Sequence, residues 1–293
     1  MSVVETLPFA LVMVSAVSHA LWNLLAKEGG DKESFMLLLN LAALVLFLPV
    51  FWFILPDWSL PVEALPFLAV SAVSETVYFL ALGKAYEGGD LSIVYPVARS
   101  SPVFVAVTAA AFLGETISAW GLVGILVIFM GVYTLHLRGL GWGDLLQPIR
   151  GLREPASMYA LAAALGTTVY SLSDKLGVTT VDPIRYSFWL SFFITGCLAA
   201  VTLRRRGLRG VASEAGGRLL RVSVAGFLMK GGYMLVLVAL SVAQVSYILA
   251  LRQVSVVLGA LLGVALLKER YGWIRVASSA VIFLGVYVLG ALA

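Results

Sequence analysis

The stretch Ser92–Leu113, SIVYPVARSSPVFVAVTAAAFL, decides how the rest of the chain is interpreted. It is long and apolar enough to cross a bilayer, yet Arg99 lies near its middle, between Pro96 and Pro102. An arginine at that depth costs roughly 2.5–3.5 kcal/mol, and each proline removes a backbone donor and disfavours regular helix just before it. Such a segment is tolerated in lipid only where it is buried in protein or lines a wet cavity. We therefore expect the rest of the chain to form the wall of that cavity.

The composition indicates that the bilayer is the solvent of this chain. Its 293 residues are 61% hydrophobic and 12% charged, and the mean hydropathy is +0.99. A soluble domain is nearer half apolar and a quarter charged. The net charge of +4 does not indicate a nucleic-acid partner, because the basic residues lie in short loops between apolar runs. The single cysteine, Cys197, excludes an internal disulfide and a cysteine-based metal cluster.

The sequence predicts an all-α integral membrane protein with ten transmembrane helices. Apolar segments of about 20 residues, the length that a bilayer core requires, fall at 7–26, 35–55, 64–86, 92–113, 118–137, 157–176, 184–203, 219–240, 244–266 and 272–291. Most connections are short, so neighbouring segments are expected to be antiparallel. Two longer polar stretches, 138–155 and 204–218, separate the fifth segment from the sixth and the seventh from the eighth.

The chain also repeats internally. One common offset relates three pairs of features: Val127–Tyr133 (VIFMGVY) with Val281–Tyr287 (VIFLGVY), Glu115 with Glu269, and Ser92 with Ser246. Each half holds five segments, an odd number, so the second half enters the membrane upside down relative to the first. The sequence therefore predicts two inverted-topology repeats, at 1–137 and 157–293, joined by an amphipathic linker at 138–156. Transporters built in this way bind substrate near the midplane, where the repeats meet.

Loop charge predicts the orientation of the chain in a cell (inner) membrane. The basic side collects Lys27, Lys32, Lys84, Arg138, Arg150, Arg153, Arg204, Arg205, Arg206, Arg209, Arg218, Lys268 and Arg270. The opposite side, which includes both termini, has little beyond Lys175 and Arg185. By the positive-inside rule, the basic side is cytoplasmic and both termini face outward.

The chain resembles the EamA type of the drug/metabolite transporter superfamily. The resemblance rests on the two five-segment halves, on LGET (Leu113–Thr116) and LKER (Leu267–Arg270) after the fourth and ninth segments, and on the glycine-bearing segment after each. The opening HALWNLLAK (His19–Lys27) further resembles a subgroup associated with phosphonate utilisation. The resemblance implies secondary transport or exchange of small metabolites through a central cavity, with no cofactor. It also implies cytoplasmic termini, opposite to the loop charge, so the orientation stays open.

Polar residues within the apolar segments predict the same cavity independently. Residues three, four or seven apart share one face of a helix. On that basis the candidate substrate-binding residues are His19, Trp22, Asn23, Glu75, Tyr78, Tyr95, Arg99, Tyr170, Ser171, Lys230, Tyr233 and Arg252. The fifth and tenth segments carry no charge in mid-span and instead have glycines suited to close packing, namely Gly121, Gly124, Gly131 and Gly285.

The charged members of this set indicate the class of ligand. Three cations, Arg99, Lys230 and Arg252, accompany one carboxylate, Glu75, which favours an anionic or zwitterionic ligand such as an amino acid, a carboxylate or a phosphonate. We expect the two arginines to hold its anionic group, since a guanidinium can bind carboxylate or phosphonate through two bonds, with Lys230 assisting. Glu75 then either neutralises Lys230 or holds a substrate amine.

Several assignments stay open at this level. His19 is either a donor in helix packing or a substrate contact or proton relay, and a metal site is not expected, because no second His or Cys lies at ligand spacing. The aromatic residues either wall the pocket or pack the core. Coupling to a proton, exchange with a counter-substrate and uniport fit equally well.

The leading interpretation is a secondary transporter that works by alternating access. The alternatives are a flippase for a lipid-linked head group and an exporter of organic cations or drugs. An enzyme would need facing carboxylates, a Ser/His/Asp set or a metal cluster at depth, which Glu75 and Asp174 alone do not supply. No catalytic residue is therefore assigned.

Overall fold

The computed structural model is helical throughout its described part, residues 3–27, 30–55, 57–88, 97–135, 137, 139, 141–267 and 272–291, in which no strand occurs. Among these residues, five helices are long and apolar enough to cross a bilayer. They are α1 (Val3–Lys27), α2 (Lys32–Ile54), α3 (Leu65–Gly88, preceded by the 3-10 turn η1 at Val62–Ala64), α9 (Pro183–Ala215) and α10 (Leu219–Val242). The expectation of a helical, multi-pass membrane protein is confirmed.

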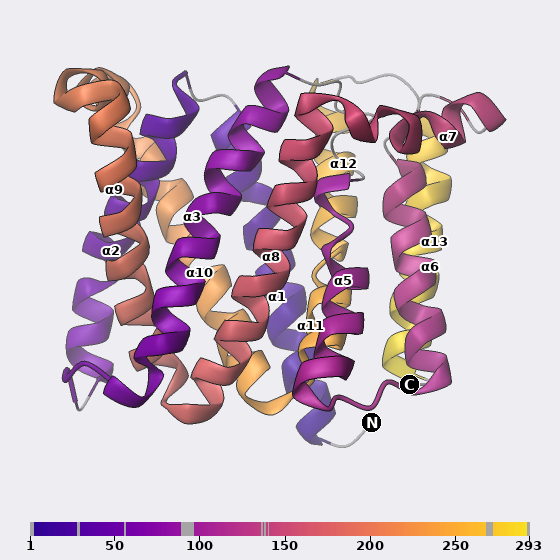
Figure 1. Ribbon diagram of the computed structural model, residues 1–293, viewed down its shortest axis with the longest axis horizontal. Helices are drawn as coiled ribbons and strands as arrows, with labels where there is room; N and C mark the ends of the chain where they lie inside the picture. Colours follow the sequence, from indigo (N-terminus) through magenta and orange to yellow (C-terminus); the bar gives the residue numbers. More distant parts are fainter. Residues whose placement is uncertain are drawn as a thin grey trace.

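The remaining helices are shorter or less apolar. They are α5 (Ser101–Thr108) with the π-helical turn η2 (Ala109–Leu113), α6 (Ala119–Leu135), α7 (Trp142–Arg150) with the 3-10 turn η3 (Gly151–Arg153), α8 (Pro155–Thr180), α11 (Val245–Leu251), α12 (Val254–Leu267) and α13 (Gly272–Ala291). α8 is rich in small and hydroxyl residues, and several of its hydroxyls bond within the helix. Thr167 and Thr168, for example, each donate to the carbonyl four residues earlier. This lets α8 pack closely against α3 (Figure 1).

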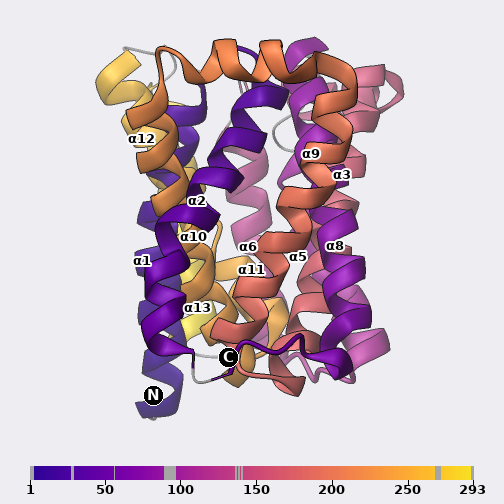
Figure 2. The same ribbon diagram turned by 90° about the vertical axis from the view of Figure 1, so that its left-hand side faces the viewer.

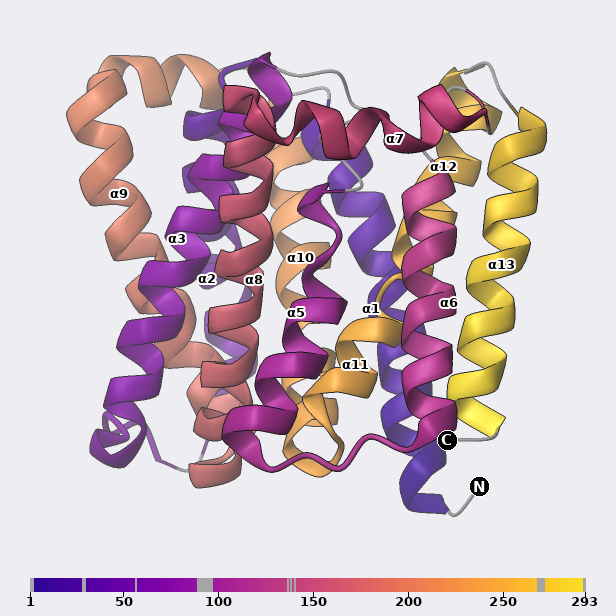
Figure 3. The same ribbon diagram turned by 45° about the vertical axis from the view of Figure 1, so that its right-hand side comes forward.

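Helices from the two ends of the chain pack against one another. The main pairs are α1 with α10, α2 with α9, α3 with α8, α5 with α11, and α6 with α13. Figure 3 shows the α6–α13 pair at one side of the bundle, while the other helices surround the middle of the bundle. α1 begins and α13 ends at the same end of the bundle, which we call the termini end (Figure 1).

Two helices are interrupted at an arginine, as the opening stretch predicts for one of them. α5 begins only at Ser101, after a turn at Arg99 and Ser100. Correspondingly, α11 and α12 are separated by a turn at Arg252 and Gln253. In each interruption a serine hydroxyl donates to a freed carbonyl, Ser100 to Val97 and Ser255 to Arg252, both at 2.7 Å. The broken backbone therefore keeps hydrogen-bond partners at membrane depth, as burial in lipid requires.

The stretch 204–218 differs from expectation. It was predicted as a polar connection, but α9 continues through it to Ala215, with a sharp bend at Gly207 (φ 68°, ψ 169°). A positive φ favours glycine, which has no Cβ to clash. Beyond the bend, the helix runs across the end of the bundle opposite the termini (Figure 2). We call Arg204–Ala215 the α9 arm. Arg204, Arg205, Arg206 and Arg209 thus lie within the helix, and residues 216–218 form a turn after it.

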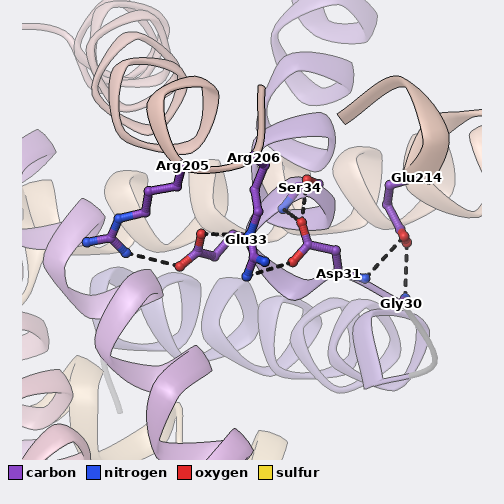
Figure 4. Close-up of polar contacts among 7 residues, drawn as sticks. All are labelled: Gly30, Asp31, Glu33, Ser34, Arg205, Arg206 and Glu214. Carbon is purple, nitrogen blue, oxygen red and sulfur yellow. Dashed lines mark hydrogen bonds and ion pairs between the residues drawn. The ribbon is translucent and has the colours of Figure 1, made fainter. Parts of the chain in front are cut away.

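The α9 arm is fastened to the connection between α1 and α2 by charged groups. Arg205 pairs with Glu33 at 3.0 Å and Arg206 with Asp31 at 3.1 Å. At the far end of the arm, the buried carboxylate of Glu214 accepts hydrogen bonds from the backbone N–H groups of Gly30 and Asp31 (Figure 4). These contacts join α9 to α1 and α2 at that end of the bundle.

Candidate substrate pocket

A cavity of about 60 Å³ lies among α1, α2, α3, α8, α9 and α10, beside the α11–α12 interruption. Of the twelve residues predicted from the sequence, eight line it: His19, Trp22, Glu75, Tyr78, Tyr170, Lys230, Tyr233 and Arg252. Helical spacing brought these residues to inward faces, and the pairing of helices brought the faces together. The structure thus gathers most of the predicted set around one cavity.

Three of the other four predicted residues are described by the structure, and they do not line the cavity. The amide of Asn23 donates back to the carbonyl of His19 in its own helix, at 2.7 Å, and does not line the cavity. Ser171 is buried and its hydroxyl has no hydrogen-bond partner within the described part of the chain. Arg99 lies behind His19, with its guanidinium 3.5 Å from Nε2. Tyr95 falls outside the described residues.

Sequence reasoning missed several residues of the pocket. Ser15, Asn40 and Ser191 add polar groups to the lining. Asn40 carried a usable signal, because it is an isolated amide within an apolar run of 20 residues or so. Its side chain donates to the carbonyl of Met36 at 2.9 Å, which leaves the amide oxygen for other donors. The serines had no comparable signal, since serine is common in packed membrane helices.

Arg252 is held at the pocket by an aromatic ring and a buried acid. Its guanidinium lies 5.4 Å from the centre of the Tyr233 ring, a cation–π distance. The Tyr233 hydroxyl donates to Oδ2 of Asp174, and the Tyr186 hydroxyl donates to Oδ1 at 2.9 Å. Asp174 is fully buried and was not among the predicted site residues, although it shares a helix face with Tyr170. It fixes the ring on which Arg252 rests.

This acid changes the balance of charge that the sequence suggested. The central region contains three cations, Arg99, Lys230 and Arg252, but two buried carboxylates, Glu75 and Asp174. The excess of positive charge is therefore one, not two. Of the two acids, only Glu75, from α3, lines the pocket, where it joins Lys230 from α10 and Arg252 from the α11–α12 turn.

Lys230 and Glu75 do not form the ion pair that was one of the alternatives. The ammonium of Lys230 donates instead to the carbonyl and hydroxyl of Ser187, at 2.6 and 2.5 Å. Oε1 of Glu75 is buried and has no hydrogen-bond partner within the described residues. A buried carboxylate oxygen without a donor is costly. Glu75 therefore presents an acceptor that a ligand's N–H or O–H group can satisfy.

His19 connects Arg99 to the pocket wall. Its Nδ1 accepts a hydrogen bond from the indole N–H of Trp22 at 3.2 Å, and its Nε2 faces Arg99. Both ring nitrogens thus face donors, and a charged imidazolium would oppose an N–H group on one side and a guanidinium on the other. The ring thus packs α1 against Arg99 and also lines the pocket.

Hydrogen bonds also close the termini end of the bundle. The carboxylate of Glu115, just before α6, accepts from the backbone of Val245 at 2.7 Å and from the hydroxyl of Ser246 at 2.6 Å. Nearby, Lys175 donates to the carbonyls of Leu240 and Ala243, which end α10. Together with the α9 arm, these contacts hold both ends together. A metabolite pocket commonly measures about 300–1,000 Å³, so the cavity of about 60 Å³ is small for a metabolite.

A multi-pass helical membrane protein with charged groups around a central cavity belongs to the class of membrane transporters for small molecules. Comparison with known proteins identifies the family. The chain belongs to the EamA-like transporter family, which matches residues 6–137 and again residues 155–291. The resemblance to the drug/metabolite transporter superfamily is thereby confirmed.

Two further comparisons agree. The chain is 26% identical to an uncharacterized transporter of Archaeoglobus fulgidus, over 95% of this chain and 97% of that protein. It also resembles a protein of known crystal structure with a TM-score of 0.73, over 97% of this chain and 99% of that one. At 17% identity, this second likeness supports the fold alone.

Proposed function

We propose that this protein is a secondary transporter that moves a small anionic or zwitterionic metabolite by alternating access through the central pocket. The observation that carries the proposal is the position of Arg252. It lies at an interruption of a membrane segment, lines the cavity and rests on Tyr233. A guanidinium at such depth is costly, and the N–H groups along its edge can bind carboxylate or phosphonate through two bonds.

The mixed charge of the pocket lining favours an amino acid, a carboxylate or a phosphonate as substrate. Arg252 and Lys230 provide positive charge for an anionic group. Glu75 provides a carboxylate oxygen that has no donor among the described residues and that a substrate amine can satisfy. A zwitterion satisfies both the cations and Glu75, whereas a simple anion satisfies only the cations. We therefore assign substrate contacts to Arg252, Lys230 and Glu75, and a supporting role to Arg99.

We further propose that ten helices cross the membrane as two inverted repeats, at 1–137 and 157–293, with 138–156 as the linker. The twofold match to the family supports this division. So does the pairing of helices: exchanging the halves turns the α1–α10 pair into the α8–α3 pair, and turns α2–α9 and α6–α13 into themselves. That is the pattern of a pseudo-twofold axis in the membrane plane.

The proposed location is the cell (inner) membrane. The basic residues of the α9 arm and of the connection between α6 and α8 lie at the end opposite the termini, so the positive-inside rule favours outward-facing termini. Proton coupling, exchange with a counter-substrate and uniport are all compatible with this pocket. Arg204→Ala and Arg209→Ala together, followed by protease accessibility of the termini, test the orientation.

An exporter of organic cations is the second candidate. Glu75 and Asp174 are both buried near the cavity, and the rings of Tyr78 and Tyr170 lie 6.0 Å apart beside it. Aromatic faces and carboxylates together bind organic cations. A flippase would additionally need an opening toward lipid, which labelled lipid analogues in proteoliposomes test.

A thermal-shift screen tests the proposal. The purified protein is heated with glycine, glutamate, succinate or 2-aminoethylphosphonate, and with choline and tetraphenylphosphonium as cations. A ligand of the folded state adds about 2.7 kcal/mol of apparent stability at a hundredfold excess over its dissociation constant. We expect stabilisation by an anion or zwitterion that is lost in Arg252→Ala and kept in the exposed control Arg204→Ala. Stabilisation by the cations alone would contradict the proposal and favour the exporter.

A further inference from the structure

A second hollow, separate from the pocket, opens at the end of the bundle opposite the termini. It is a groove of about 500 Å³ between the last turn of α1 and the first turns of α10, lined by Leu25, Gly217, Arg218, Leu220, Arg221 and Val224. It begins where the α9 arm passes into α10. No part of the proposed transport mechanism uses it.

The lining of this groove combines two arginines with aliphatic walls. Arg218 and Arg221 supply positive charge, and Leu25, Leu220 and Val224 supply the apolar surface. Leu219 and Leu220 are 67% and 79% exposed at the start of a membrane-spanning helix, where lipid is the medium that covers them. A soluble anion would use the arginines alone, whereas a phospholipid uses both parts.

The charge around the groove stays positive after its acid is counted. Arg218 donates to Glu214 at 2.7 Å, and Glu214 also receives two backbone N–H groups from the α1–α2 connection. Lys32 lies close enough for its charge to interact with both Glu214 and Arg218. Within the described part of the chain, three basic groups, Lys32, Arg218 and Arg221, thus lie near Glu214, while the neighbouring carboxylate of Asp31 pairs with Arg206. The N-terminus of α10, which has no side-chain cap, adds partial positive charge.

We propose that this groove binds the headgroup phosphate of an anionic phospholipid, with Arg218 and Arg221 at the phosphate and an acyl chain along Leu220 and Val224. Basic pockets between helices at the membrane boundary suit such headgroups. α10 also carries Lys230 and Tyr233 of the central pocket. A lipid bound at its first turn therefore stabilises the helix that forms one wall of that pocket. The proposal does not rest on which substrate the pocket takes.

Native mass spectrometry of the purified full-length protein in detergent tests this site. The protein is titrated with dioleoylphosphatidylglycerol and, in parallel, with zwitterionic dioleoylphosphatidylcholine. We expect the anionic lipid to remain bound, and its affinity to fall about tenfold in Arg221→Gln, the loss expected for one charge-assisted contact. Arg209→Gln is the matched control, since Arg209 lies on the exposed α9 arm outside the groove. The affinity of the Arg209→Gln variant for the anionic lipid is expected to stay within about twofold of the wild-type value, because this variant loses only long-range attraction.

A second variant separates shape from charge. Val224→Trp fills the groove and leaves both arginines in place, and Val224 is 42% exposed, so the helix tolerates the change. We expect it to release the anionic lipid while its melting temperature without lipid stays close to that of the wild type. Ten millimolar inorganic phosphate is expected to leave the lipid bound.

Three results would overturn the proposal. Retention of the lipid by both Arg221→Gln and Val224→Trp would remove the site. An equal loss in Arg209→Gln would reduce the effect to unspecific attraction. Displacement by inorganic phosphate would turn the groove into a site for soluble anions.

Discussion

The α6–α13 pair and the central pocket use buried space in opposite ways. In the pair, two glycines press against isoleucines: a Cβ added at Gly131 would lie 2.6 Å from Cγ1 of Ile282, and one at Gly285 would lie 2.7 Å from Cγ1 of Ile128. In the pocket, Arg252, Lys230 and Glu75 surround a cavity, and one carboxylate oxygen lacks a donor. The α6–α13 pair is therefore packed without free volume, whereas the pocket contains a buried polar atom without a protein partner among the described residues.

The difference indicates which residues serve stability and which serve transport. Lipid tails are as apolar as leucine, so helices in a bilayer associate through close packing rather than through the hydrophobic effect. Small residues at a tight contact therefore hold the protein together. Buried charges contribute little net stability, and their retention points to a ligand. Substitutions in the two regions should accordingly separate folding from binding.

Arg252→Ala is expected to separate ligand binding from folding stability most strongly. Losing a guanidinium that binds a substrate anion removes about 1.5–3 kcal/mol of binding, which corresponds to roughly 10- to 100-fold in affinity. Ligand titration in the thermal-shift assay measures this loss. The melting temperature of the ligand-free protein is expected to stay constant or to rise. A variant that binds as well as the wild type would remove Arg252 from the site.

Gly285→Ala is expected to lower the stability of the protein without changing its ligand binding. The added methyl overlaps both the side chain and the backbone N of Ile128, and overpacking typically costs about 1–3 kcal/mol. The melting temperature should fall while the ligand affinity of the folded fraction is unchanged. Gly196→Ala is the control, because a Cβ there meets nothing within 4 Å. Equal melting of the two variants would contradict the packing role.

Glu75→Gln sharpens the description of the pocket. The substitution keeps the shape and removes the charge, so affinity for a zwitterion such as glycine should fall about tenfold through loss of one charged contact. Affinity for a carboxylate without an amine should not fall. Binding of both ligand types is measured by isothermal titration. Equal loss for the two would mean that Glu75 does not contact a substrate amine.

Tyr233→Phe is expected to lower the stability of the protein and to change its ligand affinity only slightly. It keeps the ring beneath Arg252 and removes the hydroxyl that donates to Asp174. One hydrogen bond to a buried carboxylate is worth about 1.5–3 kcal/mol at most, while affinity should change by less than threefold, since the cation–π contact stays. Tyr233→Ala is the comparison. If the two variants bound ligand equally, the ring would not support Arg252.

The smallest effect is expected outside both regions, at Asp57. The backbone N–H of Ser59, with the Ser59 hydroxyl and Arg185, holds the pKa of Asp57 below its ordinary value. A carboxyl group whose pKa is lowered by folding stabilises the folded state above its ordinary pKa, and this contribution is lost as the pH falls through the lowered value. Asp57 is exposed, so Asp57→Asn should barely change the melting temperature at pH 7. A difference between the two proteins that grew on acidification would contradict this assignment.

The sequence predicted the inward faces of the helices well, because hydropathy and helical spacing are local properties. Eight of the twelve candidate residues line the cavity for that reason. The interruption at Arg99 was predictable too, since proline and a buried charge leave a clear local signal. Asn40 was equally visible as an isolated amide and could have been included.

Other features depend on contacts between distant segments. The partner of Lys230 proved to be Ser187 rather than Glu75, because side-chain geometry across helices decides such bonds. Asp174 supports Arg252 through the ring of Tyr233. The two residues lie on different helices, so helical spacing in the sequence does not relate them. The α9 arm was not predicted as helix, because a cluster of arginines in the sequence is typical of a polar loop. Its course across the end of the bundle depends on the bend at Gly207.

Concentrative uptake into proteoliposomes tests the central claim most directly. The best ligand of the thermal-shift screen, in radiolabelled form, is supplied to vesicles that contain wild-type protein, Arg252→Ala or Gly285→Ala, and uptake is divided by the amount of folded protein. We predict that Arg252→Ala retains less than about a tenth of the wild-type uptake, while Gly285→Ala, although it melts earlier, retains nearly all of it. Normal uptake by Arg252→Ala would contradict the assignment of the central pocket as the transport site.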